Sequence, residues 1–192
     1  MFFLYTANLG GHVYYATVVP RRLTLPDGTF PTGYEAKGEM ADPDYACAGC
    51  QIAPPGNNID AKDSPFMRYL PGISCHGCQT DWWYDYDAYP NAIGLTMDYS
   101  RDTGNWASFS FEGTRLEYVY LKWPHMGAAH IYIDDWYIET LDMYDANGVW
   151  QPSRVYTGWL SSGAHTIAIE VSGQKHPASS DYFVVIDGFH VN

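Results

Sequence analysis

The chain has 192 residues, of which 10 are Lys or Arg and 22 are Asp or Glu, giving a formal net charge of -12. This length suits one domain with an appendage better than two full domains. The acidic charge argues against nucleic acid as a partner, because phosphate backbones attract basic surfaces. The sequence has no apolar run near the roughly eighteen residues of a spanning helix, so we expect no membrane insertion.

The N-terminal segment, residues 1–58, begins with a predicted hairpin. The runs FFLYT and HVYYATVV are separated by a turn that contains glycine, which is typical of two paired strands. The remainder is rich in Pro, Gly and Asp and offers few apolar positions. We therefore expect this segment to pack on the following domain or on a neighbouring subunit. The first residues have no basic stretch and are not recognisable as a signal peptide.

Four cysteines form two C-x-x-C motifs, made by Cys47 with Cys50 and by Cys75 with Cys78. Two such motifs separated by a loop match the spacing of a structural zinc site with four thiolate ligands. The alternatives are disulfides that cross between the motifs, because a disulfide within a C-x-x-C motif is strained, or free thiols. The zinc and the disulfide interpretations both predict that the two motifs lie close together and attach residues 1–58 to the domain that follows.

An aromatic and acidic segment follows the second cysteine pair. It reads DWWYDYDAY from Asp81 to Tyr89 and has no pattern that would bury all its rings. Aromatic rings stack on the apolar faces of sugars, and carboxylates accept hydrogen bonds from hydroxyls. The segment therefore predicts a sugar-binding loop, with partly exposed rings, made of Trp82, Trp83, Tyr84, Asp85, Tyr86 and Asp87. The alternative is that these rings pack over the sandwich end or at a subunit contact.

Further tryptophans, at positions 106, 123, 136 and 150, have the same two interpretations. Trp123 precedes Pro124 at a predicted hairpin turn and is the one we expect to be exposed. We therefore add Trp123 to the candidate ligand-binding residues. His125 and His130 flank the same turn, where a histidine is more often a hydrogen-bonded surface residue than a ligand.

Short strands with turns between them run from Phe109 to Val191. Apolar and polar residues alternate in FSFE and in TIAIEV, and a period of two is typical of half-buried strands. Short, evenly spaced strands of this kind predict an antiparallel β-sandwich with almost no helix. The expected core comprises Phe109, Phe111, Ile131, Ile133, Ile167, Ile169, Val184 and Ile186.

These strands also carry a family resemblance. FSFEGT, GAAHIYIDD, VYTGWLSSGAHTIAIEVSG and VVIDGFHV resemble the galactose-binding-like β-sandwiches, jelly rolls that occur as carbohydrate-binding modules. The resemblance covers residues from about 59 to 192. It implies an all-β fold, an antiparallel β-sandwich with an N-terminal hairpin and loop extension over residues 1–58. It implies no particular ligand, because one fold hosts many functions.

The same resemblance implies a structural calcium ion in some members of the family. By position, Asp187 matches the acidic residue of their closing strand, and Asp63 or Glu35 would be its opening partner. The alternative is that Asp187 satisfies backbone groups at a strand end.

No nucleophile elbow, zinc-protease motif or phosphate-binding glycine loop occurs in the sequence. We therefore expect a non-catalytic surface protein with a carbohydrate-binding-type module, exposed on a virion or an extracellular filament. Its expected partners are carbohydrate and the other subunits of an assembly. One alternative is a structural decoration subunit that binds no glycan, and a third hypothesis is a glycan-active enzyme.

Overall fold

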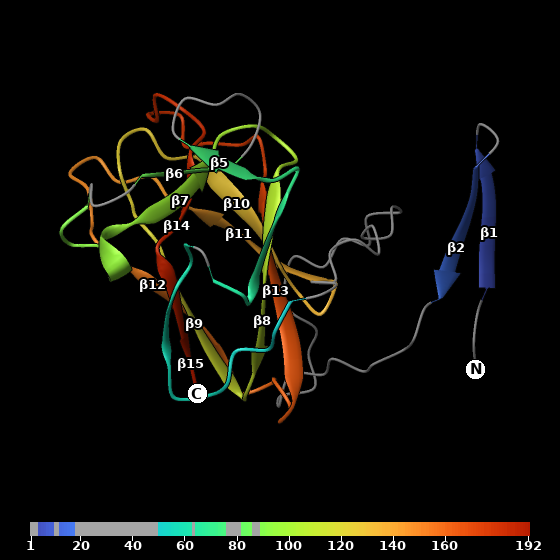
Figure 1. Ribbon diagram of the computed structural model, residues 1–192. Coiled ribbons are helices and arrows are strands. Elements are labelled where there is room, and N and C mark those ends of the chain that lie inside the picture. Colours follow the sequence, from blue (N-terminus) through green and yellow to red (C-terminus); the bar gives the residue numbers. More distant parts are fainter. Residues whose placement is uncertain (1–3, 10–11, 18–49, 63, 76–81, 86–88) are drawn as a thin grey trace.

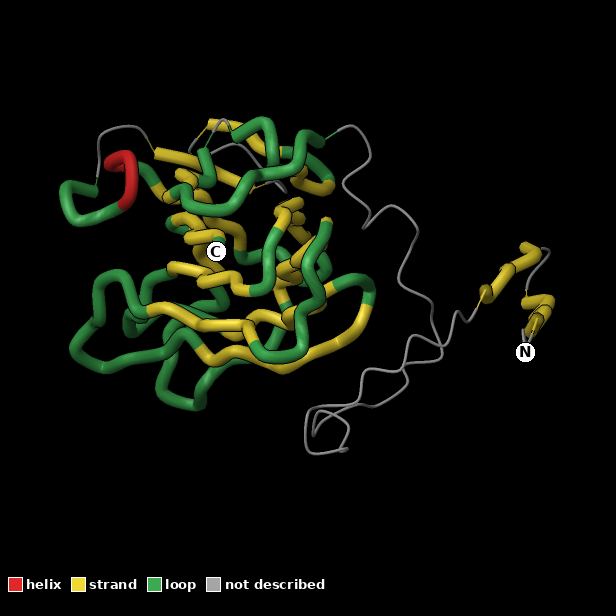
Figure 2. Tube along the Cα trace, turned by 90° about the horizontal axis from the view of Figure 1, so that it is seen from below, coloured by secondary structure: helices red, strands yellow, loops and turns green. Residues whose placement is uncertain are grey.

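The computed structural model describes residues 4–9, 12–17, 50–62, 64–75, 82–85 and 89–192 (Figure 1). Nearly all regular structure in these residues is strand. Their helical structure is a single 3-10 turn, η2 (Ile93–Leu95), drawn red in Figure 2. The expectation of an all-β fold with almost no helix is confirmed.

One layer is a five-stranded sheet in which every neighbouring pair is antiparallel. Its strands, in spatial order, are β11 (Trp136–Asp142), β10 (Ala128–Ile133), β13 (Ala164–Val171), β8 (Trp106–Glu112) and β4 (Met67–Leu70). A two-residue turn joins β10 to β11, with Asp134 at φ 50° and Asp135 at φ 65°. Two consecutive positive φ values suit the right-handed twist of the strands that they connect.

The other layer consists of two four-stranded sheets. The first contains β12 (Ser153–Thr157), β9 (Arg115–Val119), β15 (Gly188–Val191) and β3 (Asn58–Asp60). The second contains β14 (Val184–Ile186), β7 (Met97–Ser100), β6 (Trp82–Asp85) and β5 (Ile73–Cys75). These pairs are antiparallel except β5 with β6, which is parallel. The chain passes from one sheet to the other at Asp187, between β14 and β15.

The core lies between the layers, where β8 faces β15 (Figure 1). Phe109 of β8 stacks on Phe189 of β15 with ring centroids 4.1 Å apart and planes 2° from parallel. Tyr118, which lies opposite Phe189 on the neighbouring strand β9, has its ring centroid 5.6 Å from that of Phe189. All eight residues that the alternation of apolar and polar residues predicts to be in the core are buried, so that prediction is confirmed.

A separate two-stranded sheet forms the N-terminal hairpin that the sequence predicts. In it β1 (Leu4–Leu9) pairs antiparallel with β2 (His12–Thr17), and Leu9 lies opposite His12 at the turn. Residues 18–49, the remainder of the arm up to the second cysteine, lie outside the described residues.

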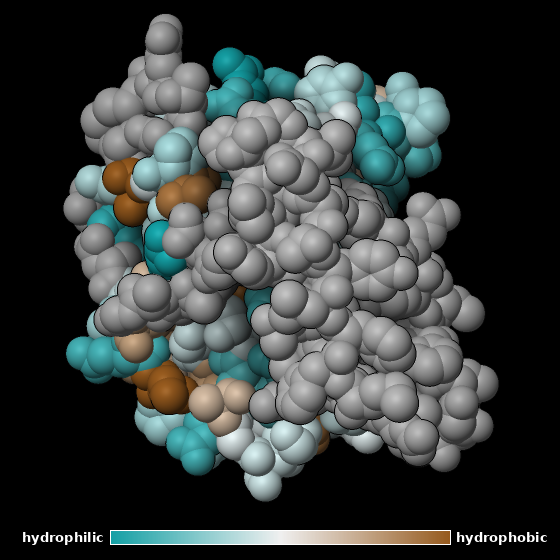
Figure 3. All heavy atoms as spheres, turned by 90° about the vertical axis from the view of Figure 1, so that its right-hand side faces the viewer, coloured by the Kyte–Doolittle hydropathy of each residue, from teal (hydrophilic) through white to brown (hydrophobic). Residues whose placement is uncertain are grey.

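The described surface offers little apolar area on the face shown in Figure 3, where most coloured side chains are hydrophilic and the brown patches are small. None of the helical structure in the described part is long and apolar enough to cross a membrane.

Candidate functional site

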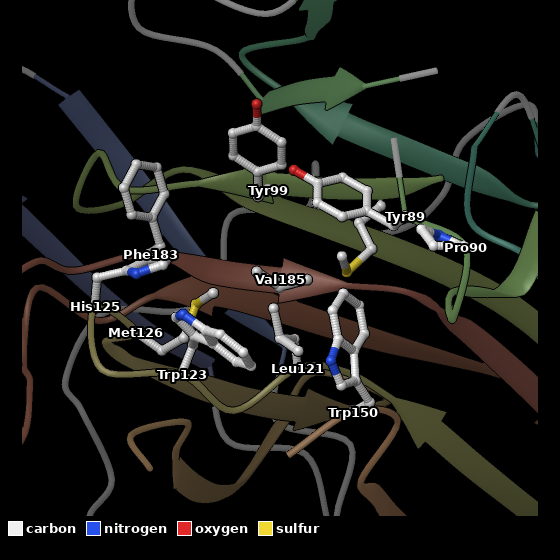
Figure 4. A pocket seen from close by; sticks show the side chains of 11 residues that line it. Tyr89, Pro90, Tyr99, Leu121, Trp123, His125, Met126, Trp150, Phe183 and Val185 are labelled. Atoms are coloured by element: carbon white, nitrogen blue, oxygen red, sulfur yellow. The ribbon is translucent and has the colours of Figure 1, made fainter. Parts of the chain in front are cut away.

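A pocket of about 420 Å³ lies between β7 and β14 on one side and the chain that follows β9 on the other (Figure 4). Its lining is largely aromatic and comprises Tyr89, Pro90, Met97, Tyr99, Leu121, Trp123, His125, Met126, Trp150, Phe183 and Val185. In Figure 4 the rings of Tyr89, Tyr99 and Phe183 lie across from Trp123 and Trp150, with Val185 and Leu121 between them. The volume is within the range of about 300–1,000 Å³ found for small-molecule sites.

Backbone pairing brings the two tryptophans of the pocket together. The N–H of Lys122 donates to the carbonyl of Val149 at 3.0 Å, and the N–H of Val149 donates back at 2.8 Å. Trp123 and Trp150 follow these two residues, and their ring centroids lie 6.0 Å apart with an interplanar angle of 61°. This wall of the pocket is thus formed where the chain after β9 continues to pair, through Lys122, with the segment around Val149.

A tight turn supports Trp123 from behind. The carboxylate of Asp145 accepts hydrogen bonds from the N–H groups of Asn147 at 2.9 Å and Gly148 at 3.0 Å. Gly148 has a φ of 79°, and a Cβ atom added to it would lie 2.0 Å from the Trp123 ring. Only glycine allows the turn to come so close to the indole.

Replacing Gly148 with alanine is therefore expected to push the Trp123 ring out of position and to weaken ligand binding at the pocket by roughly tenfold. Gly158 offers a matched control, because its φ is 85° and an added Cβ would meet nothing within 4 Å. Both variants carry the cost of alanine at positive φ, about 1–2 kcal/mol. Calorimetric titration and thermal melting of the two variants separate the clash from this shared cost, and equal affinities would contradict the positioning role.

The opposite wall comes from β14 and β7, where Val185 pairs with Tyr99. The ring centroids of Phe183 and Tyr99 are 5.8 Å apart. The ring centroid of Trp83 lies 5.7 Å from that of Tyr99 and 6.1 Å from that of Phe183. The guanidinium of Arg101 lies over Trp83 and Phe183 and forms an ion pair with Asp181 at 3.2 Å. Trp83 thus supports this wall without lining the pocket.

The expectation of a loop with partly exposed rings at residues 82–87 is wrong in two respects: residues 82–85 are not a loop, and Trp82 is not exposed. Trp83 and Tyr84 are partly exposed, as expected, and ligand binding by them stays a prediction. Residues 82–85 form strand β6 between β5 and β7. Trp82 is fully buried beside Tyr69, so its ring offers no face to a ligand. Tyr84 is half-buried with the ammonium of Lys62 4.1 Å from its ring centroid.

The local sequence pattern does not reveal that β5 pairs with this segment in parallel, and pairing with β5 and β7 makes residues 82–85 a strand. Asp85 is the last residue of β6, while Tyr86 and Asp87 lie outside the described residues. Among the candidate ligand-binding residues that the structure describes, Trp123 alone lines the pocket. From the sequence, Trp150 has two interpretations, ligand binding or packing. Tyr89 stands in the sequence only as the last residue of the aromatic segment.

The cysteine motifs fall mostly outside the described residues. Cys50 is disulfide-bonded, and a disulfide sulfur is not a thiolate ligand for zinc. Cys75 ends β5, and Cys47 and Cys78 are not described. Thiol titration after denaturation, with and without reductant, and zinc analysis of the purified protein distinguish the expectations. Four thiols and one bound zinc would favour the metal site, and no thiols without reductant would favour two disulfides.

Asp187 is almost fully buried at the point where the chain changes sheets. Its carboxylate accepts hydrogen bonds from the N–H of Ile93 at 2.6 Å and from the side-chain amide of Gln151 at 3.3 Å. Burial raises the pKa of Asp187 to about 6; these hydrogen bonds oppose the rise and the charge of Asp60 adds to it. The alternative interpretation, a carboxylate that satisfies backbone donors, therefore describes the contacts present.

The donors near Asp187 fit a calcium ion only in part. Asp60 and Asp187 supply hard oxygen ligands, but calcium takes six to eight oxygens. The oxygens of Asp60 already accept hydrogen bonds from Thr96 and from the N–H of Lys62. Within the described residues no group of three or more His, Cys, Asp or Glu could hold a metal. Asp63 and Glu35 are not described, and calcium binding stays a prediction.

Comparison with known proteins identifies the fold. No protein-family model matches the chain, and no curated protein matches it by sequence. A xanthan lyase from Paenibacillus matches 73% of this chain over 13% of its own, at 18% identity and a TM-score of 0.50.

A two-domain esterase active on acetylated mannans matches 83% of this chain over 42% of its own, at 14% identity and a TM-score of 0.50. The same esterase crystallised with mannopentaose matches 70% over 36%, at 12% identity and a TM-score of 0.50. The chain therefore spans less than half of each of these proteins. These likenesses concern the fold alone, an antiparallel β-sandwich.

Proposed function

We propose that the sandwich is a non-catalytic carbohydrate-binding module whose aromatic pocket binds a neutral sugar. The observation that carries the proposal is the rim of the pocket, where Tyr89, Trp123, Trp150 and Phe183 are half-buried or exposed around the opening. Rings of this kind stack on the apolar faces of pyranoses, and the Trp and Tyr polar groups can hydrogen-bond to sugar hydroxyls.

The composition of the lining supports binding rather than hydrolysis. Among the described residues that line the pocket, none is Asp, Glu, Lys or Arg. Glycoside hydrolysis usually needs two carboxyl groups that flank the bond to be broken. A pocket without charged side chains, in a chain of net charge -12, also disfavours acidic sugars.

The proteins with similar folds add an argument by analogy. One is a xanthan lyase, and another is an esterase active on acetylated mannans. Their names place comparable sandwiches in proteins that act on polysaccharides, which supports the ligand class and leaves the particular sugar open.

Affinity electrophoresis of the folded protein through gels that contain neutral or acidic polysaccharides tests the proposal. We expect retardation by at least one neutral polysaccharide and none by acidic ones. The absence of retardation by any neutral polysaccharide, with the protein folded by circular dichroism, would discard the proposal. Release of reducing sugar or acetate from a bound glycan would instead favour the glycan-active enzyme.

A second part of the proposal concerns assembly: the protein is an exposed component of a virion or of an extracellular filament. In the described residues, β1 and β2 pair only with each other, and an isolated two-stranded hairpin is marginally stable in water. Strands from other subunits would complete it. Light scattering should then give a large particle for the full chain and a smaller species after removal of residues 1–17. Assembly without glycan binding would favour the purely structural alternative.

A further inference from the structure

We propose that the pocket selects a neutral sugar carrying a small apolar substituent, such as an O-acetyl group, with the substituent on the pocket floor and the sugar ring at the rim. This inference rests on the proposed carbohydrate binding and names the class of ligand. It follows from a difference in chemistry between the floor and the rim of the same pocket.

The floor is apolar and almost closed to solvent. Met97, Leu121, Met126 and Val185 line it and are only 3–7% exposed. They come from β7, from the chain after β9 and from β14, so the floor is part of the packed core. The rim is open by comparison, with Trp150 exposed to 38%.

An unsubstituted pyranose fits this arrangement poorly. Its edge carries hydroxyls, and a hydroxyl buried without a partner costs about 1–3 kcal/mol. The thioether sulfurs of Met97 and Met126 are weak acceptors, and the side chains of Leu121 and Val185 have no polar atom. The methyl of an ether or of an acetyl ester would instead gain about 0.8 kcal/mol when it is buried on this floor.

The lining also limits the kind of substituent. Sulfate and carboxylate groups need basic partners, and the described lining residues include no Lys or Arg. The volume of about 420 Å³ is near the lower end of the usual range for small-molecule sites, so a long acyl chain together with a sugar ring would not fit. Methionine side chains adapt their shape, which suits a small substituent of varying position.

The experiment compares one neutral oligosaccharide in three forms: O-acetylated, chemically deacetylated, and O-methylated at the freed positions. Calorimetric titration should give binding to the acetylated form that is roughly tenfold or more tighter than to the deacetylated form. Tight binding of the O-methylated form as well would support an apolar substituent in general, and tight binding of the acetylated form alone would support the ester.

A floor variant gives an independent test. Val185→Thr replaces a methyl with a hydroxyl at nearly constant shape, so it changes the polarity of the floor, at a cost in stability that thermal melting measures. We expect the preference for the acetylated form to fall several-fold. Val155→Thr is the matched control, because Val155 is 40% exposed on β12 and does not line the pocket; it should keep the full preference.

The outcomes separate this inference from the proposed function. Equal affinity for the acetylated and deacetylated forms would overturn the substituent preference and leave carbohydrate binding intact. No binding of any form by the folded protein, together with no retardation by neutral polysaccharides, would overturn both. An unchanged preference in Val185→Thr, with thermal melting showing that the variant is folded, would overturn the assignment of the floor.

Discussion

Replacing Trp123 with alanine is expected to weaken sugar binding by about thirtyfold or more, which corresponds to roughly 2 kcal/mol. The indole contacts Trp150 on one side of the pocket and is held between the Lys122–Val149 pairing and Gly148. Its removal takes away one stacking surface and one of the two rings that, among the described residues, contact Trp150, the other being Tyr89. Binding energy in such sites is concentrated in a few aromatic residues, so the loss should be large.

The same titration on Trp136→Ala provides the control for this prediction. Trp136 is half-buried at the start of β11 and does not line the pocket. Its replacement should lower the melting temperature without changing affinity. If Trp136→Ala and Trp123→Ala lose affinity equally, the effect is one of general stability and the pocket is not the binding site.

Replacing Asp187 with asparagine is expected to stabilise the protein at neutral pH by up to about 3 kcal/mol in the presence of a chelator. The pKa of Asp187 rises from 3.8 to about 6 on folding, chiefly through burial. The folded state therefore holds this proton more tightly than the unfolded chain does. The contribution of Asp187 to the free energy of unfolding falls as the pH rises from about 4 to about 6. The asparagine side chain of the variant has no proton to lose in this range, so its contribution should stay constant.

Urea unfolding of both proteins between pH 4 and pH 7 measures this effect. The two should be similar at pH 4, and the variant should become the more stable as the pH rises. Asp60→Asn should give a smaller gain of the same sign, because the charge of Asp60 is a lesser cause of the raised pKa. Parallel profiles for all three proteins would contradict the prediction. If calcium binds, adding it should stabilise the unmodified protein and not Asp187→Asn.

The sandwich was predictable because its signal is local. In Phe109 and Phe111, or Ile167 and Ile169, the alternation of apolar and polar residues identifies the buried face without knowledge of the partner strand. The hairpin at the N-terminus was predictable for the same reason, since two β-prone runs flank a glycine turn.

The pocket was not predictable, because it depends on pairs of residues far apart in the chain. Trp123 meets Trp150 through the Lys122–Val149 pairing, and Tyr99 meets Phe183 through the pairing of β7 with β14. Trp82 was wrongly predicted to be exposed, because a strand inside a sheet can bury a ring that the local sequence pattern does not mark as buried.

The two hydrogen bonds between Lys122 and Val149 have a consequence for the thermodynamics of recognition. Because they hold the backbone beside Trp123 and Trp150 in place before a ligand arrives, little backbone conformational entropy should be lost if a sugar binds there as proposed. The backbone should then move little between the free and bound states. Association should show a negative heat capacity change from the apolar area that it buries, without the large entropic penalty of ordering a loop.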